Sequence, residues 1–206
     1  MSNRYWISIA AIAVAALVAG VYVGRLLSGP AALALESGTL YPEPRALAPF
    51  ALVDTKSAPA SVATFAGHPT LVFFGFTHCP DVCPTTLTIL SSVQKQVAMP
   101  GLKIALISVD PERDTPEALG QYISAFKGDL IGLTGDPRAI EASMKSFSVA
   151  ASKVDLGGGN YTMEHSATVF ALDSQARIVA VFTPPFRADV LTRDISKLSP
   201  VLGPRS

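Results

Sequence analysis

The chain has 206 residues and a formal net charge of zero, with 16 basic and 16 acidic residues. This balance provides no basic surface of the kind that nucleic-acid binding requires, so no nucleic-acid partner is expected. Apart from an N-terminal segment, the length is suited to one domain of ordinary size with a proper core.

An apolar run near the N-terminus, residues 6–23, is uncharged and just long enough to cross the hydrocarbon core of a bilayer. It can be a cleaved signal peptide or a retained anchor. A signal peptide has a shorter apolar region, roughly 7–15 residues, before its cleavage site. Residues 1–27 are therefore predicted to form a membrane anchor with one transmembrane helix. No cysteine directly follows the run, which excludes a lipoprotein modification. Arg4 and Arg25 flank it, so charge gives little guidance on its orientation.

The next segment, residues 28–48, contains three prolines and no sustained hydrophobic period. It is predicted to be a flexible tether with little structure of its own. The folded domain is expected to cover residues 49–206.

Strands and helices alternate along this domain, which predicts an α/β fold. Prolines at or just inside the expected starts mark three of the helices. A glycine-rich flexible loop is expected at residues 157–160, and a hairpin turn at 173–177. The predicted strands are residues 50–54, 71–76, 102–109, 167–172 and 178–182, and the predicted helices are 84–96, 115–126, 136–147 and 188–198. The order indicates a thioredoxin-like plan, with a central mixed sheet flanked by helices and ligands bound outside the strand ends.

Cys79 and Cys83 are the only two cysteines, and they follow a buried strand directly. A pair at i and i+4, on a loop that opens a helix, can hold both sulfurs near one point. Such a pair can chelate a soft metal or form a disulfide. The alternative is that both are buried as small hydrophobic residues. Prolines after both cysteines and an aspartate between them favour the chemical interpretation.

Three separated motifs then carry a family resemblance: Phe76–Pro84, Ser108–Glu117 and Glu164–Ala167. In this order they resemble the Sco/SenC family of copper-binding assembly factors for cytochrome c oxidase, over about residues 50–198. The family usually has an aspartate where this chain has Glu164, which keeps the charge. The resemblance implies copper, as Cu(I) with Cu(II) as a further state, and subunit II of the oxidase as partner.

His165 is the third candidate ligand. In thioredoxin-like proteins the loop before the strand of the final hairpin faces the cysteine loop, and here that loop offers His165. The resemblance therefore implies a copper site made of Cys79, Cys83 and His165. The alternative is a histidine that is hydrogen-bonded at a strand edge. Two thiolates and one imidazole leave no fourth protein ligand for structural zinc, whereas soft sulfur suits Cu(I). The helix N-terminus behind Cys83 is expected to lower thiol pKa values.

Other candidates are weaker. His78 adjoins Cys79, but neighbours on a turn commonly point apart. His68 precedes a strand and is expected to be solvated. Met163 can offer a thioether, although a loop methionine more often packs, and Asp81 can orient the cysteine loop through backbone N–H groups. An acidic and basic cluster is expected either to hold its own loop by ion pairs and capping or to form part of a docking rim: Asp110, Glu112, Arg113 and Asp114.

The leading hypothesis is a membrane-anchored copper metallochaperone, and not an enzyme, that delivers copper to the binuclear copper site of subunit II. A second is a thiol–disulfide oxidoreductase in which Cys79 and Cys83 form the redox-active pair, reducing the cysteines of that subunit or acting in redox signalling. The two differ over His165, because disulfide exchange should largely survive its loss. A peroxidase on the same fold is disfavoured, since a CPxxxCP pair with a downstream histidine is not the peroxidase pattern.

The expected location is a bacterial inner membrane, crossed once, and the family resemblance implies that the N-terminus lies in the cytoplasm and the domain in the periplasm. The N-terminal tail lacks the Arg- and Ser-rich presequence of an organelle import signal. Other periplasmic copper carriers and thiol–disulfide proteins are further candidate partners.

Overall fold

The computed structural model describes residues 13–14, 16–20, 22–23 and 33–203, and the chain divides into two units at residues 34 and 35. The described residues between 13 and 23 are helical. No helix in these described ranges is long and apolar enough to cross a membrane. Most of the predicted anchor, residues 1–27, lies outside the described residues.

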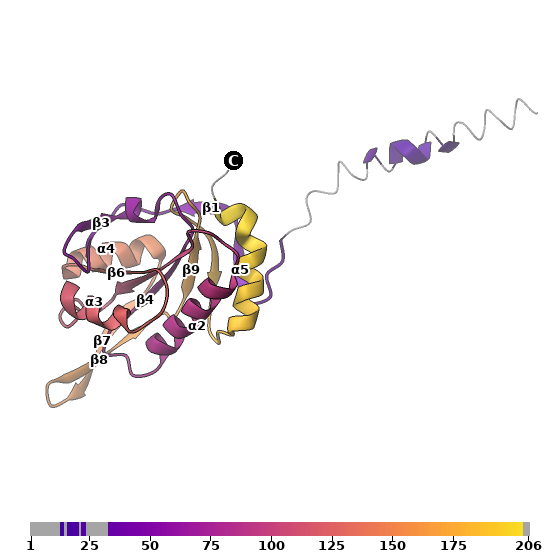
Figure 1. The fold of residues 1–206 in the computed structure, drawn as a ribbon. Helices are drawn as coiled ribbons and strands as arrows, with labels where there is room; N and C mark the ends of the chain where they lie inside the picture. The colour runs from indigo at the N-terminus through magenta and orange to yellow at the C-terminus, as the bar shows by residue number, and fades with distance from the viewer. Residues whose placement is uncertain (1–12, 15, 21, 24–32, 204–206) are drawn as a thin grey trace, which may run out of the picture. The chain divides into compact units, whose positions relative to one another are not determined.

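The second unit is built on an eight-stranded sheet with the order β1-β10-β9-β4-β5-β6-β2-β3 (Figure 1). Strand β4 is parallel to β5, and β5 to β6, whereas β9 is antiparallel to β4 and to β10. The predicted mixed sheet is therefore confirmed. The strands are β1 Gly38–Ala46, β2 Ala51–Asp54, β3 Pro59–Ser61, β4 Thr70–Gly75, β5 Lys103–Ser108, β6 Leu130–Thr134, β9 Val169–Leu172 and β10 Arg177–Phe182.

Helices flank this sheet, as predicted, and α2 and α5 contact each other (Figure 1). Thr115 accepts a hydrogen bond from the backbone N–H of Ala118, and Asp136 accepts from those of Arg138 and Ala139. These caps satisfy N–H groups that have no partner inside their helices. The helices are η1 Val62–Phe65, α2 Val82–Gln96, α3 Pro116–Ser124, α4 Pro137–Phe147 and α5 Ala188–Leu202.

Strand β4 lies in the middle of the core and all of its residues are buried. Successive side chains of a strand point to opposite faces. The ring of Phe74 packs against Phe147 of α4, with 5.2 Å between centroids, while the ring of Phe73 packs edge-on against His165 at 5.9 Å. One face of the strand therefore stabilises the core, and the other supports the region around His165.

The structure differs from the expected tether, residues 28–48, because Gly38–Ala46 form the edge strand β1. This strand pairs with β10, and its register shifts between Leu40 and Arg45. An edge strand with a bulge tolerates the prolines that made the segment look unstructured. The pairing depends on a distant strand, so no local pattern indicated it.

A second difference is the hairpin of strands β7 (Ala151–Gly157) and β8 (Asn160–His165). The sequence predicted only a flexible loop at residues 157–160. The glycines there do have positive φ angles, 83° at Gly157 and 63° at Gly158, but they turn the chain between two paired strands. The hairpin is a sheet of its own, separate from the main one, and it extends away from it in Figure 1.

Candidate metal centre

The two cysteines lie where the central strand gives way to a helix. Strand β4 ends at Gly75, the loop that follows carries Cys79, and Cys83 lies in the first turn of α2. The backbone N–H of Cys83 donates to the Sγ of Cys79 over 3.3 Å. The loop thus turns the sulfur of Cys79 back toward Cys83. Cys79 is half-buried and Cys83 is fully buried.

The sulfur of Cys83 lies directly over the end of β4. A Cβ atom added to Gly75 would come within 3.0 Å of this sulfur and 2.9 Å of the Cε1 atom of Phe73. Real Cβ atoms essentially never come as close as this contact to Phe73, and the contact to the sulfur is tighter than most, so a side chain at this position would push against both the ring and the sulfur. Glycine at position 75 leaves the space that Cys83 occupies.

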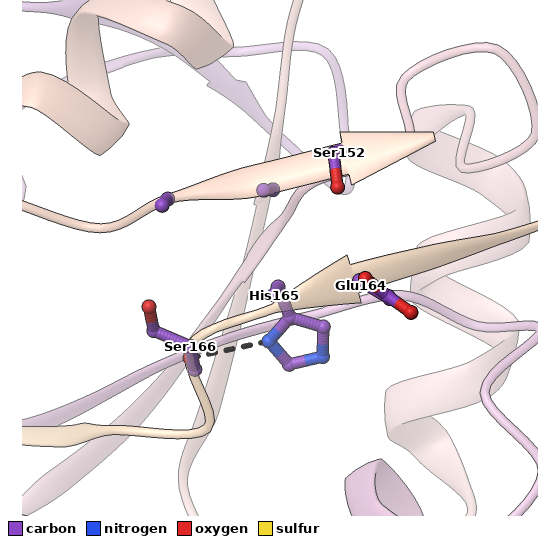
Figure 2. A pocket seen from close by; sticks show the side chains of 6 residues that line it. Ser152, Glu164, His165 and Ser166 are labelled. Atoms are coloured by element: carbon purple, nitrogen blue, oxygen red, sulfur yellow. Dashed lines mark hydrogen bonds between the residues drawn. The ribbon is translucent and has the colours of Figure 1, made fainter. Parts of the chain in front are cut away.

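His165 lies beside the sulfur of Cys83, although it comes from a distant part of the sequence. Its Nε2 atom lies 3.7 Å from the Sγ of Cys83, although the two residues are 82 positions apart. Its Nδ1 atom lies 3.2 Å from the carbonyl oxygen of Ser166 (Figure 2). A carbonyl can only accept a hydrogen bond, so Nδ1 carries the proton and Nε2 presents its lone pair to Cys83. Burial lowers the pKa of His165, which favours this neutral form.

A 3.7 Å separation between nitrogen and sulfur fits two ligands of one metal ion. Bonds of about 2.05 Å to nitrogen and about 2.3 Å to sulfur, as in zinc sites, place the two atoms about 3.8 Å apart at a trigonal angle. Across the described residues, however, no three His, Cys, Asp or Glu side chains already enclose one point. Cys83 and His165 are thus within reach of one metal ion, whereas the three candidate ligands together do not surround one point.

The expected lowering of thiol pKa is wrong for Cys83. Burial, followed by the neighbouring Cys79 thiol, raises the pKa of Cys83 well above its ordinary value. The helix N-terminus does not compensate because the side chain is completely removed from water. Cys83 is consequently a thiol at neutral pH, and any metal that binds it must displace a proton.

A cavity of about 430 Å³ opens beside Cys79 and His165. Apolar side chains, including Phe76, Pro80 and Val82, form much of its wall, and Met163 lines it as well. A second cavity, of about 350 Å³, lies along β7 and β8 and is lined by Ser152, Glu164, His165 and Ser166 (Figure 2). His165 thus borders both cavities, and it is accessible from the side where Cys79 lies.

The weaker candidates lie elsewhere or have other partners. His78 is exposed, and its Nδ1 lies 2.9 Å from the hydroxyl of Thr77. His68 contacts Thr70, at the opposite end of β4 from the cysteine loop. The carboxylate of Asp81 makes no capping bond to the backbone and accepts only from the hydroxyl of Thr85, at 3.3 Å. Neither histidine joins Cys83 and His165.

Asp114, which the sequence placed in a charge cluster, is fully buried and lies directly behind the cysteine loop. Its carboxylate accepts hydrogen bonds from Thr77 and from the hydroxyl of Ser108 at the end of β5. Sequence reasoning did not assign this role, although an aspartate between a strand end and a helix cap was the available signal. The cluster therefore holds its loop, as one of the two interpretations expected.

Comparisons with known proteins agree with this arrangement. The SCO1/SenC family model matches residues 39–199. An SCO2-like protein of Rickettsia prowazekii is 33% identical over 154 residues, which cover 73% of this chain and 73% of that protein.

Two solved structures share the fold. Arabidopsis thaliana ScoI with copper bound gives a TM-score of 0.71 at 30% identity, and the match covers 73% of this chain and 96% of that one. Bradyrhizobium japonicum ScoI with copper bound gives 0.67 at 38% identity, with 74% and 98% covered. The likeness shows the thioredoxin-like α/β fold that the sequence predicted.

Proposed function

Because this chain belongs to the SCO1/SenC family, we propose that it is a copper metallochaperone that helps to assemble the binuclear copper site of cytochrome c oxidase subunit II. In this proposal Cys79, Cys83 and His165 bind the copper. The observation that carries it is the 3.7 Å separation between the Nε2 of His165 and the Sγ of Cys83, two side chains with soft or borderline donor atoms. Relatives of known structure hold copper on the same fold.

Copper is the cargo of such a protein, so the site must both hold and release it. Two thiolates and one imidazole suit Cu(I), which accepts low coordination numbers, and the imidazole also suits Cu(II). Three protein ligands leave one position free for a ligand from the receiving protein. The cavity beside Cys79 and His165 provides the approach to that position.

The test is copper stoichiometry combined with X-ray absorption on the unit that begins at Leu35. One copper with two sulfur ligands and one nitrogen ligand is expected. Replacing either cysteine with alanine should abolish stable binding, and His165→Ala should weaken it strongly. His78→Ala is the matched control, since His78 is exposed and lies outside the site. Unchanged copper retention in His165→Ala would exclude the three-ligand site.

We also propose that residues 6–23 remain as an anchor in a bacterial inner membrane, with the domain in the periplasm. The support is the length and lack of charge of this run. A reporter enzyme that works only in the periplasm should be active when it is fused to the C-terminus of the chain. The mature protein should retain its N-terminal segment. Cells without the protein should lose oxidase activity mainly when copper is scarce. Undiminished oxidase in copper-poor cells would indicate a different client.

The second candidate, a thiol–disulfide oxidoreductase, is supported by the unequal exposure of the two cysteines. Cys79 is accessible to a partner, whereas Cys83 is buried behind it, as an attacking and a resolving thiol would be. The His165→Ala variant separates the two functions. If His165→Ala still exchanges thiols with a reduced or oxidised partner peptide at the full rate but binds copper weakly, the thiol–disulfide oxidoreductase is favoured.

A further inference from the structure

The two segments that carry the candidate ligands are both fastened to one short loop, Asp110–Asp114. The C-terminal end of this loop holds the cysteine loop, because Asp114 accepts three hydrogen bonds from Thr77. Asp110 and Arg113 of the same loop hold strand β8, which ends at His165, through a set of contacts to Tyr161. The second connection has no part in the function proposed above, and it involves a residue that no sequence motif singled out.

Tyr161 is held on several sides. Its hydroxyl donates to the Oδ1 atom of Asp110 over 2.8 Å, and its carbonyl accepts from the Nη1 of Arg113 over 3.1 Å. The guanidinium of Arg113 also lies over the ring of Tyr161, 3.8 Å from its centroid, and 5.8 Å from the centroid of Phe76. Arg113 itself donates to Asp110. The Arg113 side chain thus lies between the strand of His165 and the residue that opens the cysteine loop.

Tyr161 and His165 lie four positions apart on β8, and a strand places such residues on the same face. The distance along the strand is roughly 13 Å. In the described part of the chain, β7 and β8 pair only with each other, so no strand of the main sheet fixes their position. The side-chain contacts of the hairpin therefore help to determine where His165 lies relative to Cys83, together with the packing of His165 on Phe73 and Phe76.

We propose that Tyr161 is a positioning residue of the metal centre: its bonds to Asp110 and Arg113 fix strand β8 and thereby keep the Nε2 of His165 beside the Sγ of Cys83. The positioning is a property of the metal-free protein. Only its effect on copper rests on the function proposed above.

The contacts of Tyr161 are not equivalent. The side chain of Asp110 is 3% exposed, and its Oδ1 atom would lose the Tyr161 donor in a buried position, although Arg113 still pairs with Oδ2. Lys153 also lies over the Tyr161 ring, at 3.8 Å, but its partner is Glu112, and the side chains of that ion pair are 46% and 60% exposed. Exposed ion pairs contribute little. The hydroxyl bond to Asp110 should therefore matter, and the Lys153–Glu112 pair should not.

The test compares four variants of the whole chain, two that change the proposed contacts and two controls. Tyr161→Phe removes only the hydroxyl and leaves the ring in place. Glu112→Gln, in the same cluster, and Tyr41→Phe, the same chemical change in the edge strand β1, are the controls. Circular dichroism and thermal melting first establish that each variant is folded. Arg113→Lys, which keeps the charge but loses the planar donor group, repeats the test from the other partner.

Two measurements follow. In the metal-free protein, the ring nitrogen signals of His165 report by NMR on the hydrogen bond at Nε2. Tyr161→Phe and Arg113→Lys should shift these signals, and both controls should leave them unchanged. In copper titrations the same two variants should lose roughly 10- to 100-fold in affinity, as expected for groups that orient a metal ligand.

The outcomes separate the two proposals. Unchanged His165 signals in folded Tyr161→Phe and Arg113→Lys would overturn the positioning role, whatever the copper result. If the wild-type protein binds no copper, the copper function is refuted. Shifted His165 signals in these two variants would then still support the positioning role. Equal shifts in Glu112→Gln would also overturn the proposal, because they would indicate a general loosening of the hairpin.

Discussion

Thr77 and Asp114 are joined by three hydrogen bonds. The backbone N–H of Thr77 donates to both carboxylate oxygens, at 3.3 and 3.1 Å, and its hydroxyl donates to Oδ1 at 2.6 Å. Thr77 lies two positions before Cys79, so these bonds hold the start of the cysteine loop against the end of β5. Burial raises the pKa of Asp114 while the bonds to Ser108 and Thr77 oppose that rise.

Asp114→Asn should destabilise the fold, because an amide cannot replace two acceptor oxygens in a buried position. A loss of about 1–3 kcal/mol in the free energy of unfolding is expected, and urea denaturation measures it. Asp81→Asn is the control, since Asp81 is exposed on the same loop and makes only one long bond. Equal stability of the two variants would show that the Thr77 bonds do not secure the loop.

Copper affinity should increase with pH through the neutral range. The pKa of Cys83 is raised, so its proton is still bound there and must be displaced by the metal. The pKa of His165 is lowered, so the imidazole is already neutral and releases no proton. Competition with a Cu(I) chelator should show a rise of at least about tenfold per pH unit between about pH 7 and 8. His165→Ala should bind more weakly with the same slope. A flat profile would contradict this account.

Without metal, Cys79 and Cys83 should oxidise to one intramolecular disulfide. The bond from the Cys83 N–H to the Cys79 sulfur shows that the loop already brings this sulfur toward Cys83. With diamide as oxidant, the two thiols lose two protons and two electrons, and the protein mass should fall by about 2 Da. The oxidised protein should not bind copper, and a reductant should restore binding. Mass spectra showing only free thiols or linked dimers would disprove the expectation.

The folded unit should require residues 36–40. The fully buried carboxylate of Asp194 on α5 accepts from the backbone N–H groups of Glu36 and Ser37, at 2.7 and 2.8 Å. A variant that starts at Tyr41 should be less stable than one that starts at Leu35, because the buried carboxylate loses these backbone donors. Urea denaturation should show a free energy of unfolding that is lower by about 3 kcal/mol. Asp194→Asn in the shorter variant should recover part of the lost stability, because no charge is then buried without these donors. Equal stability would show that these residues are dispensable.

Local signals predicted much of this fold. Thr115 and Asp136, each followed by proline, marked two helix starts correctly because capping depends on neighbouring residues only. The apolar runs of β4 and β5 marked the buried centre of the sheet. The cysteine pair and its place at a strand end were also readable, since both follow from spacing within a few residues.

Other features depend on distant parts of the chain and were not predicted. Strand β1 exists because β10 offers it an edge, and β7 and β8 stabilise each other. The approach of His165 to Cys83 was expected from a family resemblance, not from any pattern between them. The raised pKa of Cys83 follows from its complete burial, and the residues next to it in the sequence did not predict that burial.

Because Cys83 lies over the end of β4, the candidate site has one closed side and one open side. The sulfur has the backbone of Gly75 beneath it and no exposed surface, whereas Cys79 and His165 border the open cavity. A ligand from a receiving protein that approaches through this cavity meets the bonds to Cys79 and His165 first. Copper bound at this site should therefore lose its protein ligands in a fixed order, and the bond to the Sγ of Cys83 should be the last to break.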